Sequence, residues 1–144
     1  MNIIDISSIE KEYHIPDDRK GTFHDVLFDI IDQRGLSNKE VYTRCNIERK
    51  QFSKMQCSPN MKPGKKYVLA LCIGLGLSLD ESADLLSRAD NAFNPSDARD
   101  QYVKGFIKNG CDDIRQVNEF LAERGLELLG SFSEGVLTLT DKVI

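Results

Sequence analysis

Three helix-start signals of one kind constrain this chain more than any other feature of its sequence. A hydroxyl residue is followed three positions later by an acidic residue at Thr22–Asp25, Ser37–Glu40 and Ser78–Glu81. In this capping box the hydroxyl accepts a backbone N–H of the first helical turn, and the acidic side chain returns the bond. Gly35 and Gly76 stand where helices usually end. Apolar residues recur at helical spacing after each box, which predicts an all-α fold.

The same reasoning predicts five helices between about residues 22 and 89 and two more after Pro95. We expect Ser96 to start the sixth helix and Asp112 to cap the seventh. The residues expected to point inward are Phe23, Val26, Leu27, Ile30 and Ile31 in the first helix, Val41, Tyr42 and Cys45 in the second, Phe52 and Met55 in the third, Tyr67, Val68, Leu71, Cys72 and Leu75 in the fourth, Leu79, Ala83 and Leu86 in the fifth, Tyr102, Val103, Phe106 and Ile107 in the sixth, and Ile114, Val117, Phe120 and Leu121 in the seventh.

The expected organisation has four parts. The unit of five helices spans residues 21–92, a two-helix extension packed on it spans 93–130, and the ends are an N-terminal extension, 1–20, and a C-terminal tail, 131–144. The β-branched run Val136–Thr140 favours a strand in the tail. The two ends therefore either pair as a small β-ribbon or remain loose tails, and the sequence favours neither.

Basic residues are concentrated in one third of the chain. The net charge is −4, yet residues 34–66 hold nine basic and two acidic side chains, a balance of +7. The segments before and after this block are both acidic. A basic block inside an acidic chain is the electrostatic footprint expected of a nucleic-acid-binding surface.

The basic block coincides with two short helices that a turn of about three residues would join, the spacing of a helix-turn-helix. In that motif the second helix presents its polar face to the major groove of DNA, where Arg, Lys and Gln side chains contact the edges of bases. The helix expected over residues 48–57 is basic on the side opposite Phe52 and Met55. The candidate DNA-binding residues are Asn38, Lys39, Arg49, Lys50, Gln51, Ser53, Lys54, Lys62, Lys65 and Lys66.

Two motifs that flank this region carry a family resemblance. The run Arg34-Gly35-Leu36-Ser37 and the run Gly76-Leu77-Ser78-Leu79-Asp80-Glu81 resemble those before the second and fifth helices of the lambda-repressor-like (XRE/Cro-type) family. The resemblance covers about half of the chain and implies a five-helix DNA-binding bundle. The longer pattern, with Leu128-Leu129-Gly130-Ser131, is similar to a bacterial helix-turn-helix-like module of unsettled role that is sometimes appended to macrodomains.

The chain departs from that family at three positions. Tyr42 stands where the family has a small Ala, Asn38 where it has Gln, and Glu48 where it has a Ser or Thr cap. The resemblance implies a DNA-binding transcriptional regulator. The departures leave a second hypothesis for the function. Under that hypothesis the protein is an interaction module or adaptor that keeps the fold and binds a partner protein through residues 96–125 or the tail.

Homodimerisation is also expected, because one recognition helix contacts few bases and the apolar faces of the last two helices need a surface to cover them.

The remaining features favour a protein without catalytic chemistry. The spacings of Cys45, Cys57, Cys72 and Cys111 match no zinc or redox motif. No partnered nucleophile or phosphate-binding glycine loop is found, so we expect no enzyme activity, metal or cofactor. The absence of a signal peptide, of a long apolar run and of paired cysteines predicts a cytoplasmic protein that does not bind membranes.

Overall fold

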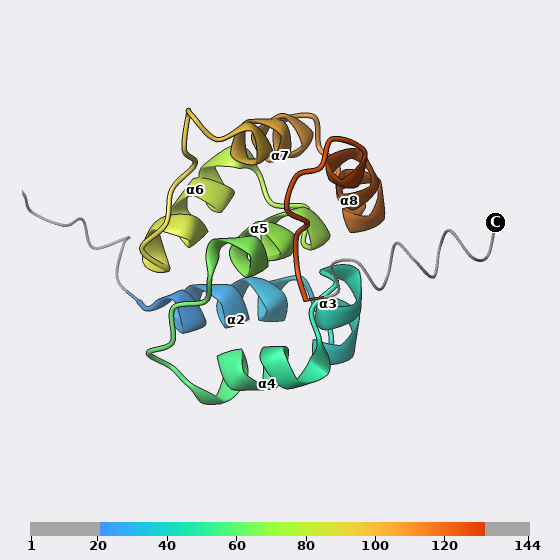
Figure 1. Ribbon diagram of the computed structural model, residues 1–144. Helices are drawn as coiled ribbons and strands as arrows, with labels where there is room; N and C mark the ends of the chain where they lie inside the picture. The colour runs from blue at the N-terminus through green and yellow to red at the C-terminus, as the bar shows by residue number, and fades with distance from the viewer. Residues whose placement is uncertain (1–20, 132–144) are drawn as a thin grey trace, which may run out of the picture.

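The computed structural model describes residues 21–131, and within that range every regular element is an α-helix (Figure 1). The N-terminal extension, the C-terminal tail after Ser131 and the strands expected there lie outside the described residues. No helix in this range is long and apolar enough to cross a membrane. The helices are α2 (Phe23–Gln33), α3 (Asn38–Arg44), α4 (Arg49–Cys57), α5 (Lys65–Gly74), α6 (Leu79–Arg88), α7 (Ala98–Lys108) and α8 (Ile114–Glu123).

Helix α5 forms the centre of the bundle. Every residue from Val68 to Gly74 is buried, so this helix is apolar on all sides, as a fully surrounded helix must be. It contacts α3, α6, α7 and α8, while α2 packs against α4 and α6. Helix α4 lies along one edge of the molecule and α7 along the opposite edge (Figure 1). The last two helices therefore share one core with the first five.

Local sequence signals account for most helix boundaries. Both hydrogen bonds of the capping box form at Thr22 and at Ser78, and the Ser37 hydroxyl accepts the N–H of Glu40. Asn46 follows α3 with a φ of 56°, a left-handed conformation that Asn tolerates better than most residues. The predicted caps at Thr22, Ser37 and Ser78 and the expected left-handed turn are thus confirmed, with the full capping box formed at Thr22 and Ser78.

Two predicted caps are wrong by one residue. The side chain that caps α7 is Asp97 rather than Ser96, and the one that caps α8 is Asp113 rather than Asp112. In each pair both residues have a side-chain oxygen able to accept the N–H of the first turn. Because either of two adjacent residues can be the N-cap, the sequence alone does not fix where the helix begins. The packing of its apolar face against the core decides between them.

Two residues expected to point inward do not. Tyr102 is 41% exposed, because the buried face of α7 follows Val103 and Ile107 and Tyr102 stands one position away from it. Its ring instead meets that of Phe120 on α8, with the centroids 4.9 Å apart. Ala83 is exposed for the same reason, because the buried face of α6 follows Ser82, Leu85 and Leu86.

Candidate nucleic-acid interface

Helix α4 has one buried face and one exposed basic face. Phe52 and Met55, three positions apart, are both buried. Four candidate residues, Arg49, Lys50, Ser53 and Lys54, are exposed, and Gln51 is half-buried at the boundary between the faces. The three cations form no ion pair with any residue between 21 and 131. Their charge is therefore available to a ligand at this surface.

An aromatic cluster holds α4 against the helices behind it. The ring of Phe52 lies 5.7 Å from that of Phe28 on α2 and 5.9 Å from that of Tyr42 on α3, centroid to centroid. At the other end of α4, the carbonyl oxygen of Gln56 lies 2.8 Å from Nε2 of His24. Tyr42, larger than the residue that the family resemblance implies, thus contacts α4 directly. The rings fix the face that α4 turns outward.

The close helix crossing in this region lies elsewhere, between α3 and α5. A Cβ placed on Gly74 would overlap Sγ of Cys45 and lie 2.9 Å from its Cα. It would also lie 3.0 Å from the carbonyl oxygen of Arg44. A small residue is therefore present at a tight crossing, but it is Gly74 on α5 rather than a residue of α3.

Of the candidate residues outside α4, Asn38 and Lys39 begin α3 with exposed side chains. Lys66, on the first turn of α5, places Nζ 5.2 Å from the ring centroid of Tyr67. Lys62, in the loop before α5, places Nζ 2.7 Å from Oδ2 of Asp90. Both partners of that ion pair are more than half exposed, and such surface pairs contribute only about 0–1 kcal/mol. Lys62 can therefore exchange Asp90 for another anion at small cost.

Lys65 is held differently from Lys62. Its Nζ lies 2.7 Å from Oδ2 of Asp100, a carboxylate with 0% of its side chain exposed. Sequence reasoning placed Lys65 among the residues that could meet phosphates, and the structure turns it into the bundle. Removing it would leave a buried carboxylate without its close cation, which is far more costly than breaking a surface pair. Lys65 therefore forms an ion pair that links α5 to α7.

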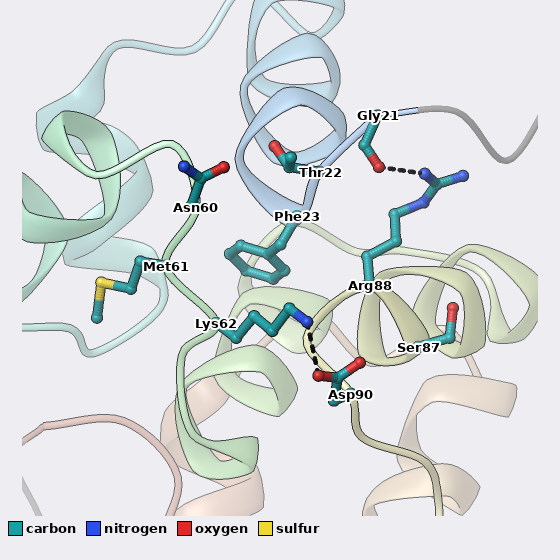
Figure 2. A pocket seen from close by; sticks show the side chains of 9 residues that line it. All are labelled: Gly21, Thr22, Phe23, Asn60, Met61, Lys62, Ser87, Arg88 and Asp90. Atoms are coloured by element: carbon teal, nitrogen blue, oxygen red, sulfur yellow. Dashed lines mark hydrogen bonds and ion pairs between the residues drawn. The ribbon is translucent and has the colours of Figure 1, made fainter.

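A hollow of about 610 Å³ lies between the start of α2, the loop after α4 and the end of α6. Figure 2 shows the charged side chains around it already engaged: Lys62 with Asp90, and Arg88 with the carbonyl oxygen of Gly21. Phe23 lines the same hollow. Both cations at this hollow already have an anionic partner, Asp90 for Lys62 and Asp84 for Arg88, so we assign no charged ligand to it.

Cys45, Cys57, Cys72 and Cys111 are all unpaired thiols. No group of three or more His, Cys, Asp or Glu side chains within residues 21–131 could hold a metal ion. Burial raises the pKa of the Cys72 thiol to about 12. Burial, and to a smaller extent the neighbouring Cys72, raises the pKa of Cys45 still further. Both thiols therefore stay protonated, and neither is an activated nucleophile.

Sequence reasoning missed one set of residues at this surface. The segment after α8 returns to the turn between α3 and α4, where Ser131 contacts both sides of that turn (Figure 1). Its N–H donates to the carbonyl oxygen of Asn46, and its hydroxyl oxygen accepts the N–H of Glu48. A partner 83 positions away leaves no periodic signal in the sequence, and the run Leu128-Leu129-Gly130-Ser131 was noted only for its resemblance to the bacterial module.

Comparison with protein-family models, with curated proteins and with solved structures found no match to this chain.

Proposed function

We propose that this protein binds duplex DNA as a helix-turn-helix protein of the lambda-repressor-like kind, with α4 in the major groove. The observation that carries the proposal is the exposed face of α4. Arg49, Lys50 and Lys54 lie on it without an ion pair to any described residue, and α3 and α2 support the opposite face. Transcriptional regulation follows as the role of such a protein.

The chemistry of this face suits the recognition of bases. The major groove is about 12 Å wide and admits one α-helix. Arg and Lys donate to O6 and N7 of guanine, Gln pairs with adenine, and Ser donates to or accepts from either. Arg49, Lys50 and Gln51 belong to the first turn of α4, the part of a recognition helix that contacts base edges most often.

Phosphate contacts would come from the flanks of this helix. Asn38 and Lys39 are exposed at the start of α3, the helix that precedes α4. Lys62 and Lys66 lie after α4 and can meet the opposite strand. Such contacts fix the orientation of the protein on the duplex and account for most of the salt dependence of binding.

We further propose that two copies bind together. A single short helix reads only a few base pairs, and two-fold dimers gain specificity by binding two half-sites about one helical turn apart. Sedimentation at micromolar concentration should give the mass of two chains. A monomer in solution that also binds duplex DNA one chain at a time would refute the dimer. It would not contradict the proposal that α4 contacts DNA.

A protein-binding role is the second candidate, favoured by the surface of α7 and α8. Tyr102 is exposed there, and Cζ of Arg124 lies 3.5 Å from the ring centroid of Phe120. Tyr and Arg are enriched at protein interfaces. The exposed side chains of α2 include Asp25, Asp29 and Asp32, which would repel phosphates rather than attract them. An adaptor of this kind would show little affinity for DNA even at low salt.

A pair of charge-matched double variants tests the proposal. Replacing Arg49 and Lys50 together with Ala removes two exposed cations from α4, and replacing Lys108 and Arg115 removes two from α7 and α8. A base contact is worth about 1–3 kcal/mol, so the first variant should lose roughly a hundredfold in affinity for a selected duplex. The second should bind as wild type does. Equal binding by both variants would remove α4 from the interface.

A further inference from the structure

Two side-chain amides hold Leu129, in the segment that follows α8. The carbonyl oxygen of Leu129 accepts from Nδ2 of Asn118 on α8 and from Nδ2 of Asn46 in the turn between α3 and α4, each at 3.1 Å. The N–H of Leu129 donates to Oδ1 of Asn118 at 2.8 Å. The same peptide is therefore fixed to the last helix and to the turn that precedes α4.

Gly130 allows this close approach. Its φ is +88°, and a Cβ at this position would overlap the carbonyl oxygen of Asn46 and lie 3.1 Å from its carbonyl carbon. Its N–H donates to the carbonyl oxygen of Lys66 on α5 at 3.1 Å. Any other residue would have both a strained backbone and a steric clash, so only glycine lets the segment pass over the turn.

Ser131 then completes the contact at the start of α4. Its N–H donates to the carbonyl oxygen of Asn46 at 2.8 Å, and its Oγ accepts the N–H of Glu48 at 2.9 Å. Glu48 is the N-cap residue of α4 and its own side chain makes no capping hydrogen bond. The N–H of the N-cap residue is thus held by a residue 83 positions further along the chain, at a helix start that has no side-chain cap of its own.

We propose that Ser131 is a positioning residue for the recognition helix, so that the last two helices set how α4 is presented to DNA. This inference rests on the proposed function. Arg49 and Lys50 directly follow Glu48, so the backbone conformation at Glu48 determines the position and direction of these two side chains. Contacts to base edges depend on distance and direction, and a small change at the start of α4 is therefore felt at the bases.

Removing the hydroxyl of Ser131 tests this role. Ser131→Ala deletes the acceptor for the N–H of Glu48 and leaves the backbone bond to Asn46 in place. We expect hydrogen exchange at the Glu48 amide, followed by NMR, to rise roughly threefold to tenfold, the worth of one hydrogen bond. Affinity for the selected duplex should fall by a similar factor, while its salt dependence stays the same because no cation is lost.

Two further variants serve as the control and the rescue. Ser96→Ala removes an exposed hydroxyl in the loop before α7 and should change neither quantity. Ser131→Thr keeps a hydroxyl at the turn and should restore both. Duplex affinity that Ser131→Ala leaves unchanged, while wild type binds DNA, would overturn the positioning role alone. A wild-type protein without duplex affinity at low salt would overturn this role together with the proposed function.

Discussion

Gly74 on α5 lies directly against Cys45 at the end of α3, with no room for a side chain between the two backbones. A Cβ on Gly74 would overlap Sγ of Cys45 and lie 2.9 Å from its Cα. The turn that follows Cys45 leads into α4, so this crossing determines where the exposed basic helix begins. Backbone atoms cannot move aside as a flexible side chain can, and the crossing therefore depends on glycine at position 74.

Replacing this glycine should destabilise the fold despite the better helix propensity of alanine. Alanine in place of glycine within a helix normally gains about 0.5–1 kcal/mol. At Gly74 the added methyl group overpacks the crossing, which typically costs about 1–3 kcal/mol. We expect Gly74→Ala to lower the free energy of unfolding measured by urea denaturation.

Gly105 is the matched control for that substitution. It lies within α7, and a Cβ there would meet no atom within 4 Å. Gly105→Ala should therefore raise the free energy of unfolding by about 0.5–1 kcal/mol. A stabilising effect of similar size at both positions would show that α3 and α5 can separate, and would refute the tight crossing.

The buried ion pair of Asp100 with Lys65 should contribute more to stability than the exposed pair of Asp90 with Lys62. The Asp100 carboxylate accepts from Nζ of Lys65 and from the N–H of Asn94, and Arg99 lies 3.8 Å away. Asp100→Asn would leave Lys65 without its anion, and breaking a buried pair in this way costs about 3–5 kcal/mol. Asp90→Asn, which breaks the exposed pair with Lys62, should cost less than about 1 kcal/mol. Thermal denaturation of the two variants measures the difference, and equal melting temperatures would contradict it.

The cysteines should react with thiol reagents in order of exposure. Cys57, at the end of α4, is exposed, Cys111 is half-buried, and Cys45 and Cys72 are buried. Brief alkylation followed by mass spectrometry should label Cys57 first and leave the two buried thiols unmodified until the protein is unfolded. Early labelling of Cys45 or Cys72 would show that the core around the α3–α4 turn is open.

The same buried thiols predict a loss of stability at high pH. In the unfolded chain a thiol loses its proton near pH 9, whereas Cys72 in the fold keeps it until about pH 12. Unfolding therefore releases protons above pH 9, and stability decreases as pH rises, by about 1.4 kcal/mol per pH unit for each such thiol. Urea denaturation between pH 8 and pH 10.5 tests this. Cys57→Ser should keep the full dependence and Cys72→Ala should reduce it.

The sequence predicted the elements of this fold well because helix signals are local. Thr22, Ser37 and Ser78 each cap a helix through a residue three positions away, and Phe52 and Met55 identify the buried face of α4 by their spacing. Both kinds of signal can be read from a few adjacent positions. The exposed basic face of α4 was therefore visible before the fold was known.

Pairings across the fold could not be read in this way. Lys65 and Asp100 are 35 positions apart, and no local pattern shows that this lysine, rather than the adjacent Lys66, pairs with a buried carboxylate. The contact between Ser131 and the turn at Glu48 spans 83 positions. Such contacts depend on how α5, α7 and α8 pack together, and that packing determines which cations and which hydroxyls remain at the surface.

The salt dependence of duplex binding tests the central claim most directly. Cations that neutralise phosphates release counterions, so the logarithm of the association constant should fall linearly with the logarithm of salt concentration, with a slope of about −0.9 per phosphate contacted. We predict a steep slope for the wild-type protein, reduced by about one unit in Lys39→Ala and unchanged in Lys108→Ala. No duplex affinity at low salt, or the same slope in all three proteins, would contradict the account.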